Sequence, residues 1–303
     1  MKKITIAAVG DLLIKKKMIA AAKREGGFAP MLAKVRPYLR KADLTIGNLE
    51  TTLSGPGFRY VPGKLLFSAP DSFAATLRSS GFNVLTTANN HCMDGKTAGL
   101  KRTLNVLDRH GLRHTGTFRS AVEARRKRIL NVNGIRIGIV AYTKGTNGIS
   151  VPNTWLVNRL HRNKMIADVR SLKRSTDFII ACLHFGKEFR AYPDRSQIRL
   201  MRLLFRNGVN VVLGAHPHVL HPIKMSKMTD IDGRMRNRVS ASSLGNFVSS
   251  ELPQHTARLR GTILLLTVTK NAKGKTDVRS MSRVPTRIMQ PNGKNKVYRI
   301  VPG

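Results

Sequence analysis

The sequence predicts a single α/β domain in which helices cover a sheet of largely buried strands. Two observations indicate this class. Short apolar runs with the character of buried strands alternate with segments of helical period, and this alternation is typical of a sheet with helices packed against it. In addition, 41% of the 303 residues are hydrophobic, which is enough for one large core. We therefore assign residues 1–303 to one domain with its core at residues 3–250.

The strands and helices are expected in a regular order. Apolar runs predict strands at residues 4–9, 44–47, 84–87, 137–142, 178–183 and 209–213. Helical periodicity predicts helices at residues 30–40, 72–80, 98–110, 164–172 and 197–206, with Gly111 and Gly208 as the stops of two of them. Alternating runs at 239–243, 262–269 and 278–282 predict an antiparallel finish, with the last strands over residues 260–301. The tail from about residue 292 is expected to fray.

The chain is strongly basic. It contains 54 Lys and Arg against 16 Asp and Glu, for a net charge of +38, which predicts attraction to polyanions. The bases lie on expected helical segments such as residues 162–174 and 195–206, with little of the aromatic interleaving that single-stranded nucleic-acid binders use. We therefore expect nucleic acid to bind only non-specifically, through charge. A merely solvated basic surface is an equally open interpretation.

Two further features concern the compartment. Cys92 and Cys182 are too few for a disulfide framework or a thiolate zinc cluster, so we expect reduced packing residues. The apolar run after Met1 stops at Asp11, which is too short for a signal peptide and fits a first strand. No run approaches the roughly 18 to 20 apolar residues of a transmembrane helix. The chain as written is expected to be cytoplasmic; a removed leader or anchor would instead place it at the cell surface.

Polar residues recur where the expected strands end. They are Asp11, Glu50, the run Asn89-Asn90-His91, His184, and the pair His216 and His218. Because the C-terminal ends of strands in an α/β sheet converge on one crevice, these side chains can meet there. Each one alone is a weak signal. Asp11 could cap a turn, Glu50 could pair with an arginine, and His184 could be an ordinary core histidine.

The pair His216 and His218 is the strongest of these signals. Alternate residues of an extended segment point the same way, and this pair follows a glycine at a strand end. Two imidazoles near carboxylates suit manganese, iron or zinc, whereas an all-oxygen set would suit magnesium or calcium. Asn90 next to His91 also fits a site, because an amide oxygen can ligate a metal while a histidine donates a proton. Alternatively, this run is a helix entry with Asp94 as the N-cap.

Taken together, the motifs resemble those of the calcineurin-like metallophosphoesterases, and more closely those of the bacterial capsule-synthesis family PGA_cap, also called CapA. The resemblance runs from about residue 10 to residue 248. It rests on the runs 47–50 (GNLE), 88–91 (ANNH) with Asp94, 214–218 (GAHPH) and 243–247 (SLGNF). It implies a four-layer sandwich of two central mixed β-sheets flanked by helices, and a role in making or exporting capsular poly-γ-glutamate.

The resemblance also implies six ligands for two divalent metal ions, of which manganese, iron or zinc are the expected kinds. They are Asp11 and His218 for one ion, Asn90, His184 and His216 for the other, and Glu50 as the bridge between them. Two positions depart from the wider superfamily, which carries a histidine where this chain has Leu13 and a bridging aspartate where it has Glu50. One metal therefore loses a protein ligand, which leaves open whether both sites fill.

Further residues follow from the same resemblance and from charge. His91 would donate a proton to the leaving group, Asp94 would orient His91, and Asn246 would line the pocket. Lys187 and Arg190, just after His184, are expected to contact an anionic substrate, because basic side chains around a crevice raise the encounter rate with anions.

Three functions are compatible with these features. We favour a metal-dependent hydrolase or transferase that acts on a phosphoester or on the γ-amide chain of polyglutamate. A second function is a non-catalytic, metal-stabilised component that holds a polyanion in a synthesis or export complex, beside other capsule-synthesis subunits. A third, supported only by net charge, is nucleic-acid binding.

Overall fold

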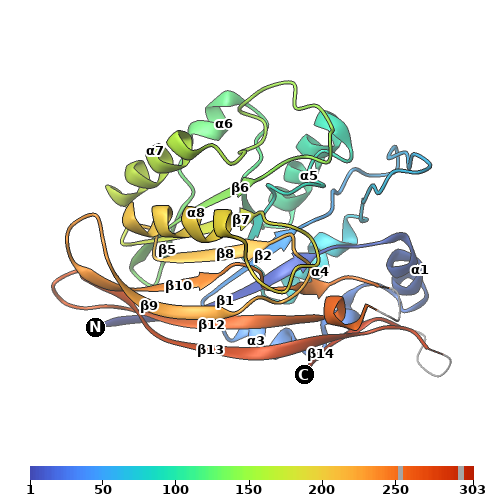
Figure 1. Cartoon of the computed structure of the whole chain (residues 1–303). Coiled ribbons are helices and arrows are strands. Elements are labelled where there is room, and N and C mark those ends of the chain that lie inside the picture. Colours follow the sequence, from blue (N-terminus) through green and yellow to red (C-terminus); the bar gives the residue numbers. More distant parts are fainter. Residues whose placement is uncertain (252–254, 293–296) are drawn as a thin grey trace.

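The computed structural model of the chain describes residues 1–251, 255–292 and 297–303. Within these ranges the strands form two sheets, each with parallel and antiparallel pairs (Figure 1). The first sheet has the order β14 (Arg299–Pro302), β13 (Thr276–Met289), β12 (Arg260–Lys270), β1 (Lys2–Leu12), β2 (Leu44–Leu49), β3 (Val84–Thr86) and β4 (Arg113–Thr115), and β11 (Asn246–Val248) also pairs with β1. The second sheet has the order β5 (Ile129–Val132), β6 (Ile135–Thr143), β7 (Phe178–His184), β8 (Val211–Ala215), β10 (Met235–Ala241) and β9 (Ile223–Thr229).

The two sheets stack face to face, and β1 shows why. Its side chains alternate between two faces, as in any strand. Ile4, Ile6 and Ala8 enter a core shared with strands of the second sheet, including β6, β7 and β8. Ala7 and Val9 enter a different core, on the opposite face of the first sheet. Because both faces of β1 are buried, its sequence is a nearly continuous apolar run.

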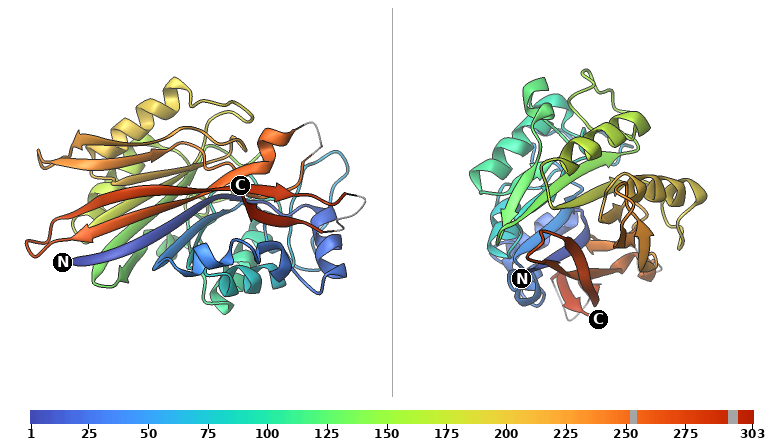
Figure 2. Two further views of the ribbon diagram at one scale, coloured as in Figure 1. Left: turned by 90° about the horizontal axis from the view of Figure 1, so that it is seen from below. Right: turned by 90° about the vertical axis from the view of Figure 1, so that its left-hand side faces the viewer.

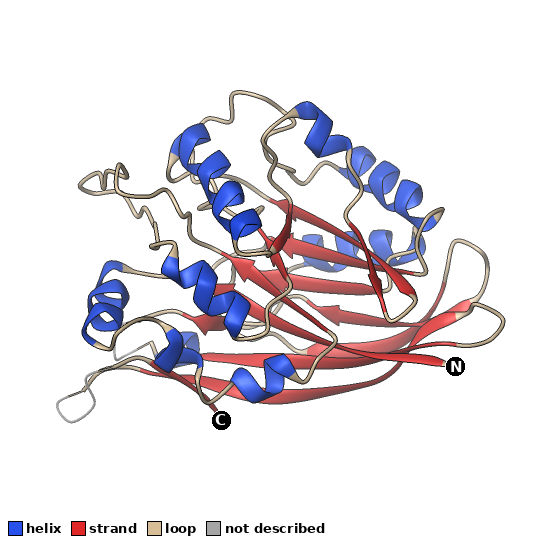
Figure 3. Cartoon of the chain, turned by 180° about the vertical axis from the view of Figure 1, so that it is seen from behind, coloured by secondary structure: helices blue, strands red, loops and turns tan. Residues whose placement is uncertain are grey.

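Helices cover the two outer faces. The first sheet is covered by α1 (Lys16–Arg24), α2 (Ala29–Leu32), α3 (Arg36–Arg40), α4 (Ser72–Ser79) and part of α5 (Lys96–Arg109), all of which contribute to its outer core. The second sheet is covered by α7 (Arg162–Lys173) and α8 (Arg195–Arg206). Figures 2 and 3 show these layers from other sides. The described residues therefore form the predicted order of helices, sheet, sheet and helices.

Most of the expected elements are present, but the prediction of one continuous helix at residues 30–40 is wrong. Residues 30–40 form two short helices, α2 and α3, in place of one. Pro37 lies in the first turn of α3, where it cannot donate the backbone hydrogen bond to residue 33 that a continuous helix requires. The expected strand at 209–213 lies two residues later, as β8, because its parallel pairing with β7 and β10 begins at Val211.

The expectation of a frayed tail is also wrong for its last residues. Residues 299–302 form β14 and pair with β13 between Met289 and Thr286, and Ile300 is fully buried. Ordered pairing at a chain end holds the terminus in place. Part of the same expectation, at residues 293–296, lies outside the described residues. The antiparallel finish is confirmed for β12, β13 and β14, whereas β10 and β11 also form parallel pairs.

Sequence patterns also missed several elements. They are the helices α1 and α6 (Ala121–Arg125), the 3-10 helix at Thr256–Leu259, the short strands β4, β5 and β11, and the strand β9. β9 is mostly exposed, so it lacks the buried apolar face by which a strand is recognised. Among the described residues no helix combines the length and the apolarity that crossing a bilayer requires.

The parallel strands position the site. β1, β2 and β3 run parallel in the first sheet, and β6, β7 and β8 run parallel in the second. Asp11, near the end of β1, lies opposite Asn48 of β2 on one side and Asn246 of β11 on the other. The ladder between β1 and β2 shifts between Ala8 and Asp11, which is the kind of irregularity that re-aims a side chain.

Candidate metal centre

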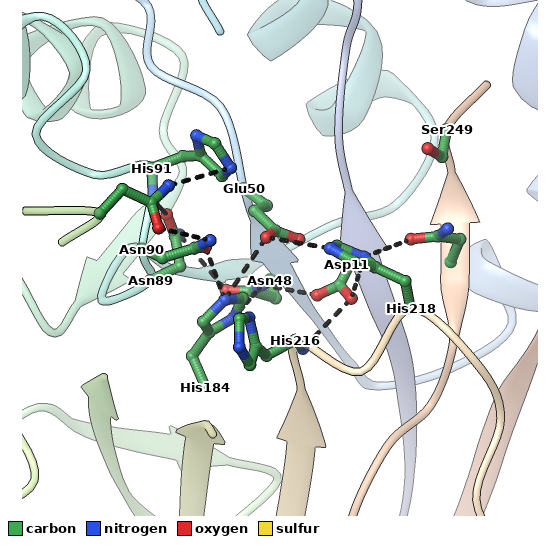
Figure 4. A network of polar contacts seen from close by, with 12 residues as sticks. Asp11, Asn48, Glu50, Asn89, Asn90, His91, His184, His216, His218 and Ser249 are labelled. Atoms are coloured by element: carbon green, nitrogen blue, oxygen red, sulfur yellow. Dashed lines mark hydrogen bonds and ion pairs between the residues drawn. The ribbon is translucent and has the colours of Figure 1, made fainter. Parts of the chain in front are cut away.

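The strand ends of both sheets meet at one cluster of carboxylates, amides and imidazoles (Figure 4). Asp11 comes from β1, Glu50 directly follows β2, and Asn90 lies four residues after β3. His184 is the last residue of β7, and His216 and His218 follow β8. The expected convergence of C-terminal strand ends is therefore present in the fold.

Glu50 lies between two groups of possible metal ligands. The first group is Asp11, Glu50 and His218, and the second group is Glu50, His184 and His216. In each group the potential ligand atoms lie within 4.8 Å of one another. Because Glu50 belongs to both groups, its carboxylate is in the position that a bridging ligand would need.

The first group surrounds His218. Its Nδ1 lies 3.3 Å from Asp11 Oδ2 and 3.0 Å from Asn246 Oδ1. Its Nε2 lies 3.7 Å from Glu50 Oε1. Hydrogen bonds at one ring nitrogen fix the orientation of the ring and leave the other nitrogen to face the cluster.

The second group surrounds His184. Its Nε2 lies 2.8 Å from Asn90 Oδ1 and 3.4 Å from Glu50 Oε1, and its Nδ1 lies 3.2 Å from Asn48 Nδ2. The rings of His184 and His216 have centroids 4.8 Å apart. Asn90 donates from its Nδ2 to Asn147 Oδ1 at 3.2 Å, so that its carbonyl oxygen points to His184.

The two groups differ in protonation. Burial lowers the pKa of both His184 and His216, so the second group presents neutral imidazoles at neutral pH. Burial acts in the same direction on His218, but Glu50, Asp11 and Asn246 outweigh it and raise the pKa of His218 to about 10. A metal ion would have to displace the proton of His218, because only a neutral imidazole binds a metal, and both groups then offer the nitrogen and oxygen donors that manganese, iron and zinc accept.

The two carboxylates also differ in pKa, which is lowered for Asp11 and raised for Glu50. Burial tends to raise the pKa of Asp11, yet its hydrogen bond and charge interaction with His218 lower it to about 2. For Glu50, burial and the nearby Asp11 carboxylate raise the pKa well above its ordinary value. A fully buried carboxylate is strongly disfavoured unless a cation or several donors compensate it.

This environment fits a divalent metal. Both carboxylate oxygens of Glu50 and the Nδ1 of His216 are buried without a hydrogen-bond partner in the described structure. Buried polar atoms are normally satisfied, and a dication bound by Glu50, Asp11 and the imidazoles would satisfy these. The donor set present therefore fits the metal pair that the sequence predicts.

His91 lies beside the ligand groups and forms a dyad with Asp94. Its Nδ1 lies 2.9 Å from Asp94 Oδ2, and its Nε2 lies 3.4 Å from Asn147 Nδ2. Asp94 Oδ2 also accepts a hydrogen bond from the backbone N–H of Phe67 at 2.6 Å. Asp94 is therefore not the N-cap of α5, whose N-cap position is Gly95. The same carboxylate holds the His91 ring and the loop that carries Phe67.

The prediction that His216 and His218 lie on an extended segment is wrong. Their backbone φ angles are +98° and +59°, in the left-handed region, so the segment is a tight turn rather than an extended strand. Non-glycine residues rarely adopt these angles, and they persist where surrounding structure enforces them. The turn sends the two imidazoles to different ligand groups, with their ring centroids 6.2 Å apart.

The loop after His184 presents other residues to the cluster than those expected. Lys187 and Arg190 are exposed, and the contact that links Arg190 to this region is its backbone carbonyl, which His221 Nε2 approaches to 2.8 Å. Between them, Phe189 lies with its ring centroid 6.0 Å from that of His218. The charge of Glu188 acts on Glu50 and His216. The roles of Lys187 and Arg190 stay a prediction.

Sequence reasoning also missed two asparagines. Asn48 donates to Asp11 Oδ1 at 2.8 Å and contacts His184, and thus joins the two ligand groups. Its place one residue before the end of β2 was a usable signal, since side chains at a strand end face the crevice. Asn147, which contacts both Asn90 and His91, lies in a Thr-Asn-Gly turn, where an asparagine is usually a turn residue only.

The motifs that form this cluster match one known family. The family described as bacterial capsule synthesis protein PGA_cap matches residues 5–251, which contain all six expected metal ligands. The chain belongs to the PGA_cap family.

Two PGA_cap relatives have names that specify a process. A capsule biosynthesis protein CapA from Bacillus anthracis is 24% identical over 307 residues, which cover 98% of this chain and 72% of the relative. A PGA biosynthesis protein CapA from Bacillus subtilis (strain 168) is 26% identical over 280 residues, which cover 91% of this chain and 70% of the relative.

A solved structure shares the fold. It is the crystal structure of a protein from Mycoplasma pneumoniae described as a novel phosphatase, with a TM-score of 0.54, 15% identity and 94% of each chain covered. At this identity the likeness concerns the fold alone. The PGA_cap chain has the calcineurin-like metallophosphoesterase sandwich, as the sequence predicts.

Leu13, for which the resemblance implies a histidine in the wider superfamily, is buried. It is 3% exposed and its backbone N–H donates to Val248 O at 2.8 Å. An aliphatic side chain offers no donor to a metal. A metal held by the group of Asp11, Glu50 and His218 would therefore receive no ligand atom from the side chain of Leu13.

Proposed function

We propose that this PGA_cap chain is a metal-dependent hydrolase or transferase in the synthesis or export of capsular poly-γ-glutamate. The family description and the names of the two Bacillus relatives support the process. The cluster at the strand ends supports the chemistry. The substrate is an anion, either a phosphoester or the polyglutamate chain itself.

The observation that carries the proposal is the state of Glu50. It is fully buried, neither of its carboxylate oxygens has a hydrogen-bond partner among the described residues, and it is shared by two groups of nitrogen and oxygen donors. A carboxylate in that position is unfavourable in a protein that only needs a stable core. It is favourable as a ligand between two cations.

The assignment of ligands follows the two groups. Asp11 and His218 would hold one divalent metal, and His184, His216 and the side-chain oxygen of Asn90 would hold the other. Glu50, which belongs to both groups, would contribute to either. Manganese, iron or zinc suits this mixture of imidazole and oxygen donors. When bound, a metal pair of this kind polarises the substrate and lowers the pKa of water.

The residues beside the ligands handle the proton and the substrate. His91 donates a proton to the departing group from Nε2, because Asp94 occupies its Nδ1. Asp94 stabilises the protonated ring and keeps it oriented. Asn246 fixes His218 through Nδ1. Lys187 and Arg190 contribute to the positive potential that draws an anion to the crevice.

A second function is supported by Leu13. With one metal short of a protein ligand, the chain would act as a metal-stabilised, non-catalytic component that holds polyglutamate in a complex with other capsule-synthesis subunits. The first function predicts catalytic turnover and the second does not, whereas both predict metal binding. Hydrolysis of p-nitrophenyl phosphate, bis-p-nitrophenyl phosphate and γ-linked glutamate oligomers distinguishes them.

Metal content is the first test. The purified chain is equilibrated with manganese, iron or zinc and compared with Glu50→Gln, His216→Ala and the matched control His114→Ala. His114 is a buried histidine of β4, another strand of the first sheet, and it contacts Asp108 of α5. We expect specific metal in the wild type and the control, and its loss in the two cluster variants. Equal metal content in all four proteins would refute the proposal.

A further inference from the structure

A groove of about 540 Å³ lies between the entry to α1 and the loop of residues 60–67. Four lysines line it, and we call it the lysine groove: Lys15, Lys16, Lys17 and Lys64. Its apolar lining includes Val61 and Leu65, of which 45% and 77% are exposed. None of its lining residues is acidic. Figure 1 shows α1 and this loop at the same end of the molecule, and Figure 2 agrees.

One residue of the lysine groove, Phe67, packs against His91 beside the metal centre. Lys15 follows Asp11 by four residues, and the loop follows Glu50 after β2. Phe67 belongs to both places, because it lines the groove while its ring centroid lies 4.4 Å from that of His91. A chain lying in the groove would therefore contact Phe67, whose other neighbour is His91.

The four lysines are not equivalent. Lys15 Nζ donates to Ser250 O at 2.6 Å and contacts Glu251 Oε1 at 3.0 Å, so its charge is compensated. Lys16 Nζ lies 3.7 Å from the centre of the Tyr60 ring. Lys17 and Lys64 are exposed, and neither makes an ion pair with a carboxylate in the described parts of the chain. These two are the charges that the groove offers to a ligand.

The lining favours a carboxylate-bearing chain over a nucleic acid. Binders of single strands offer open aromatic faces on which bases stack. Here a face of Tyr60 is covered by Lys16, and the edge-on contact with Phe58, at 4.8 Å between centroids, occupies the ring further. Ammonium groups bind carboxylates as point charges. Exposed Val61 and Leu65 match the methylene groups that a γ-linked glutamate carries in its backbone.

We propose that the lysine groove binds a γ-linked polyglutamate chain through its carboxylates and leads that chain to the metal centre at His91. This inference rests on the proposed function for the identity of the polymer. It goes further in naming where the polymer lies and which side chains hold it.

The test measures binding of a fluorescent γ-linked glutamate oligomer to the metal-loaded full chain. The groove variant is Lys17→Glu with Lys64→Glu, two exposed positions whose change leaves the fold intact. The matched control is Arg199→Glu with Arg202→Glu, which makes the same charge change in a separate arginine-lined groove next to α7 and α8. We expect the groove variant to lose about tenfold or more in affinity, and the control to change less than about twofold.

Several outcomes would overturn the inference. Equal loss in the two variants would mean that overall charge alone governs binding, and no loss in either would exclude the groove. A single-stranded oligonucleotide is the second probe. If it loses affinity at the groove variant as selectively as the glutamate oligomer does, the groove is a general polyanion site and the assigned ligand is wrong.

The inference and the proposed function fail in different ways. Glu50→Gln should remove metal and turnover while oligomer binding in the groove stays within about twofold of the wild type. If metal binding proved unspecific while the groove still bound the oligomer selectively, the proposed enzymatic function would be refuted and the proposed binding groove would stand. If metal content and turnover were normal but the groove variant and the control variant bound the oligomer equally well, the binding groove would be refuted and the enzymatic function would stand.

Discussion

At the residue scale, the cluster separates ligands from a proton donor by the hydrogen bonds each histidine makes. His184 and His218 direct Nε2 toward Glu50. His91 instead has Asp94 at Nδ1 and belongs to neither ligand group. Two kinds of histidine chemistry can therefore operate side by side in one cluster, although the histidines are far apart in the sequence, because different side chains contact each ring.

The role of His91 predicts a dependence on the leaving group. His91→Asn is expected to slow the hydrolysis of an alkyl phosphoester by about 10² to 10⁴, the usual contribution of a general acid. A p-nitrophenyl ester should be slowed much less, because p-nitrophenolate departs without a proton. Steady-state rates on both esters, with metal analysis of the same samples, measure this.

The control for this prediction is His114→Asn, which removes a buried imidazole outside the cluster. It should keep both rates and the metal content. Asp94→Asn should show the same selectivity as His91→Asn to a smaller degree. Loss of metal from His91→Asn, or equal slowing of both esters, would contradict the role of a proton donor.

At the element scale, β1 depends on the absence of a side chain at Gly10. A Cβ atom there would lie 1.9 Å from the carbonyl oxygen of Gly245, and the same oxygen accepts the hydrogen bond of the Asp11 N–H at 3.0 Å. The close approach of the two backbones sets the end of β1 and hence the place of Asp11 in the cluster.

Gly10→Ala should therefore affect both stability and metal binding. We expect a loss of roughly 1 to 3 kcal/mol in the free energy of unfolding, as for other overpacked sites, because the contact is with backbone that cannot rotate away. Denaturant unfolding of the metal-free protein measures this, and metal analysis follows the displacement of Asp11. In Gly57→Ala the new Cβ atom meets nothing within 4 Å, so stability should be unchanged. Similar free energies of unfolding for Gly10→Ala and Gly57→Ala would show that the backbones at Gly10 and Gly245 can move apart to accept the new side chain.

The turn between β9 and β10 contains a further buried carboxylate, outside the metal cluster. The Asp230 side chain is fully buried and its Oδ2 lies 2.8 Å from Lys173 Nζ, 2.9 Å from Arg236 Nε and 3.0 Å from Arg238 Nη2. Arg238 is itself fully buried. Burial opposes ionisation of Asp230, but Lys173 and Arg238 lower its pKa below the ordinary 3.8.

Asp230→Asn is expected to destabilise the fold by roughly 3 to 5 kcal/mol, because it leaves the Arg238 guanidinium buried without its counter-charge. The contribution of Asp230 also depends on pH. Since its pKa is lower in the folded state, its stabilisation is complete above pH 3.8 and is lost as the pH falls through the lowered value. Urea unfolding at neutral pH and at pH values below 3.8 measures both effects.

A matched carboxylate lies two residues away. Asp232 is more exposed and contacts Arg236 at 2.6 Å, so Asp232→Asn should change the free energy of unfolding by less than about 1 kcal/mol. If the two variants were equally stable at neutral pH, the buried network would contribute nothing particular to the turn.

At the scale of the whole molecule, the net charge of +38 opposes compaction. We expect the melting temperature to rise with sodium chloride, because raising the ionic strength from about 0.01 M to about 1 M shortens the Debye length from about 30 Å to about 3 Å. Thermal melts across this range test it. The Arg199→Glu and Arg202→Glu variant, with lower net charge, should show a shallower rise. A melting temperature that falls with salt would mean that attractive ion pairs outweigh the repulsion.

Much of the fold could be predicted because its strands are buried on both faces. Runs such as residues 178–183 are apolar throughout and correspond to β7, whose residues are all buried. β9 was missed because it is mostly exposed. The prediction of one helix at residues 30–40 was wrong because the helical spacing of apolar residues continues through Pro37. The backbone hydrogen bonds of a helix cannot continue there, since proline has no N–H. The assignment of a single domain stays a prediction.

The sequence by itself determined which residue types stand at the ends of the strands, since these motifs are local and each lies directly after an apolar run. It could therefore predict Asp11, Glu50, His184 and the His216–His218 pair as one set. Only the tertiary structure decided how the set divides. The left-handed turn at His216, the neighbours of Asp11 in β2 and β11, and the contact of Phe67 with His91 depend on segments far apart in the chain. Their distances follow from the stacking of two sheets, which no local pattern records.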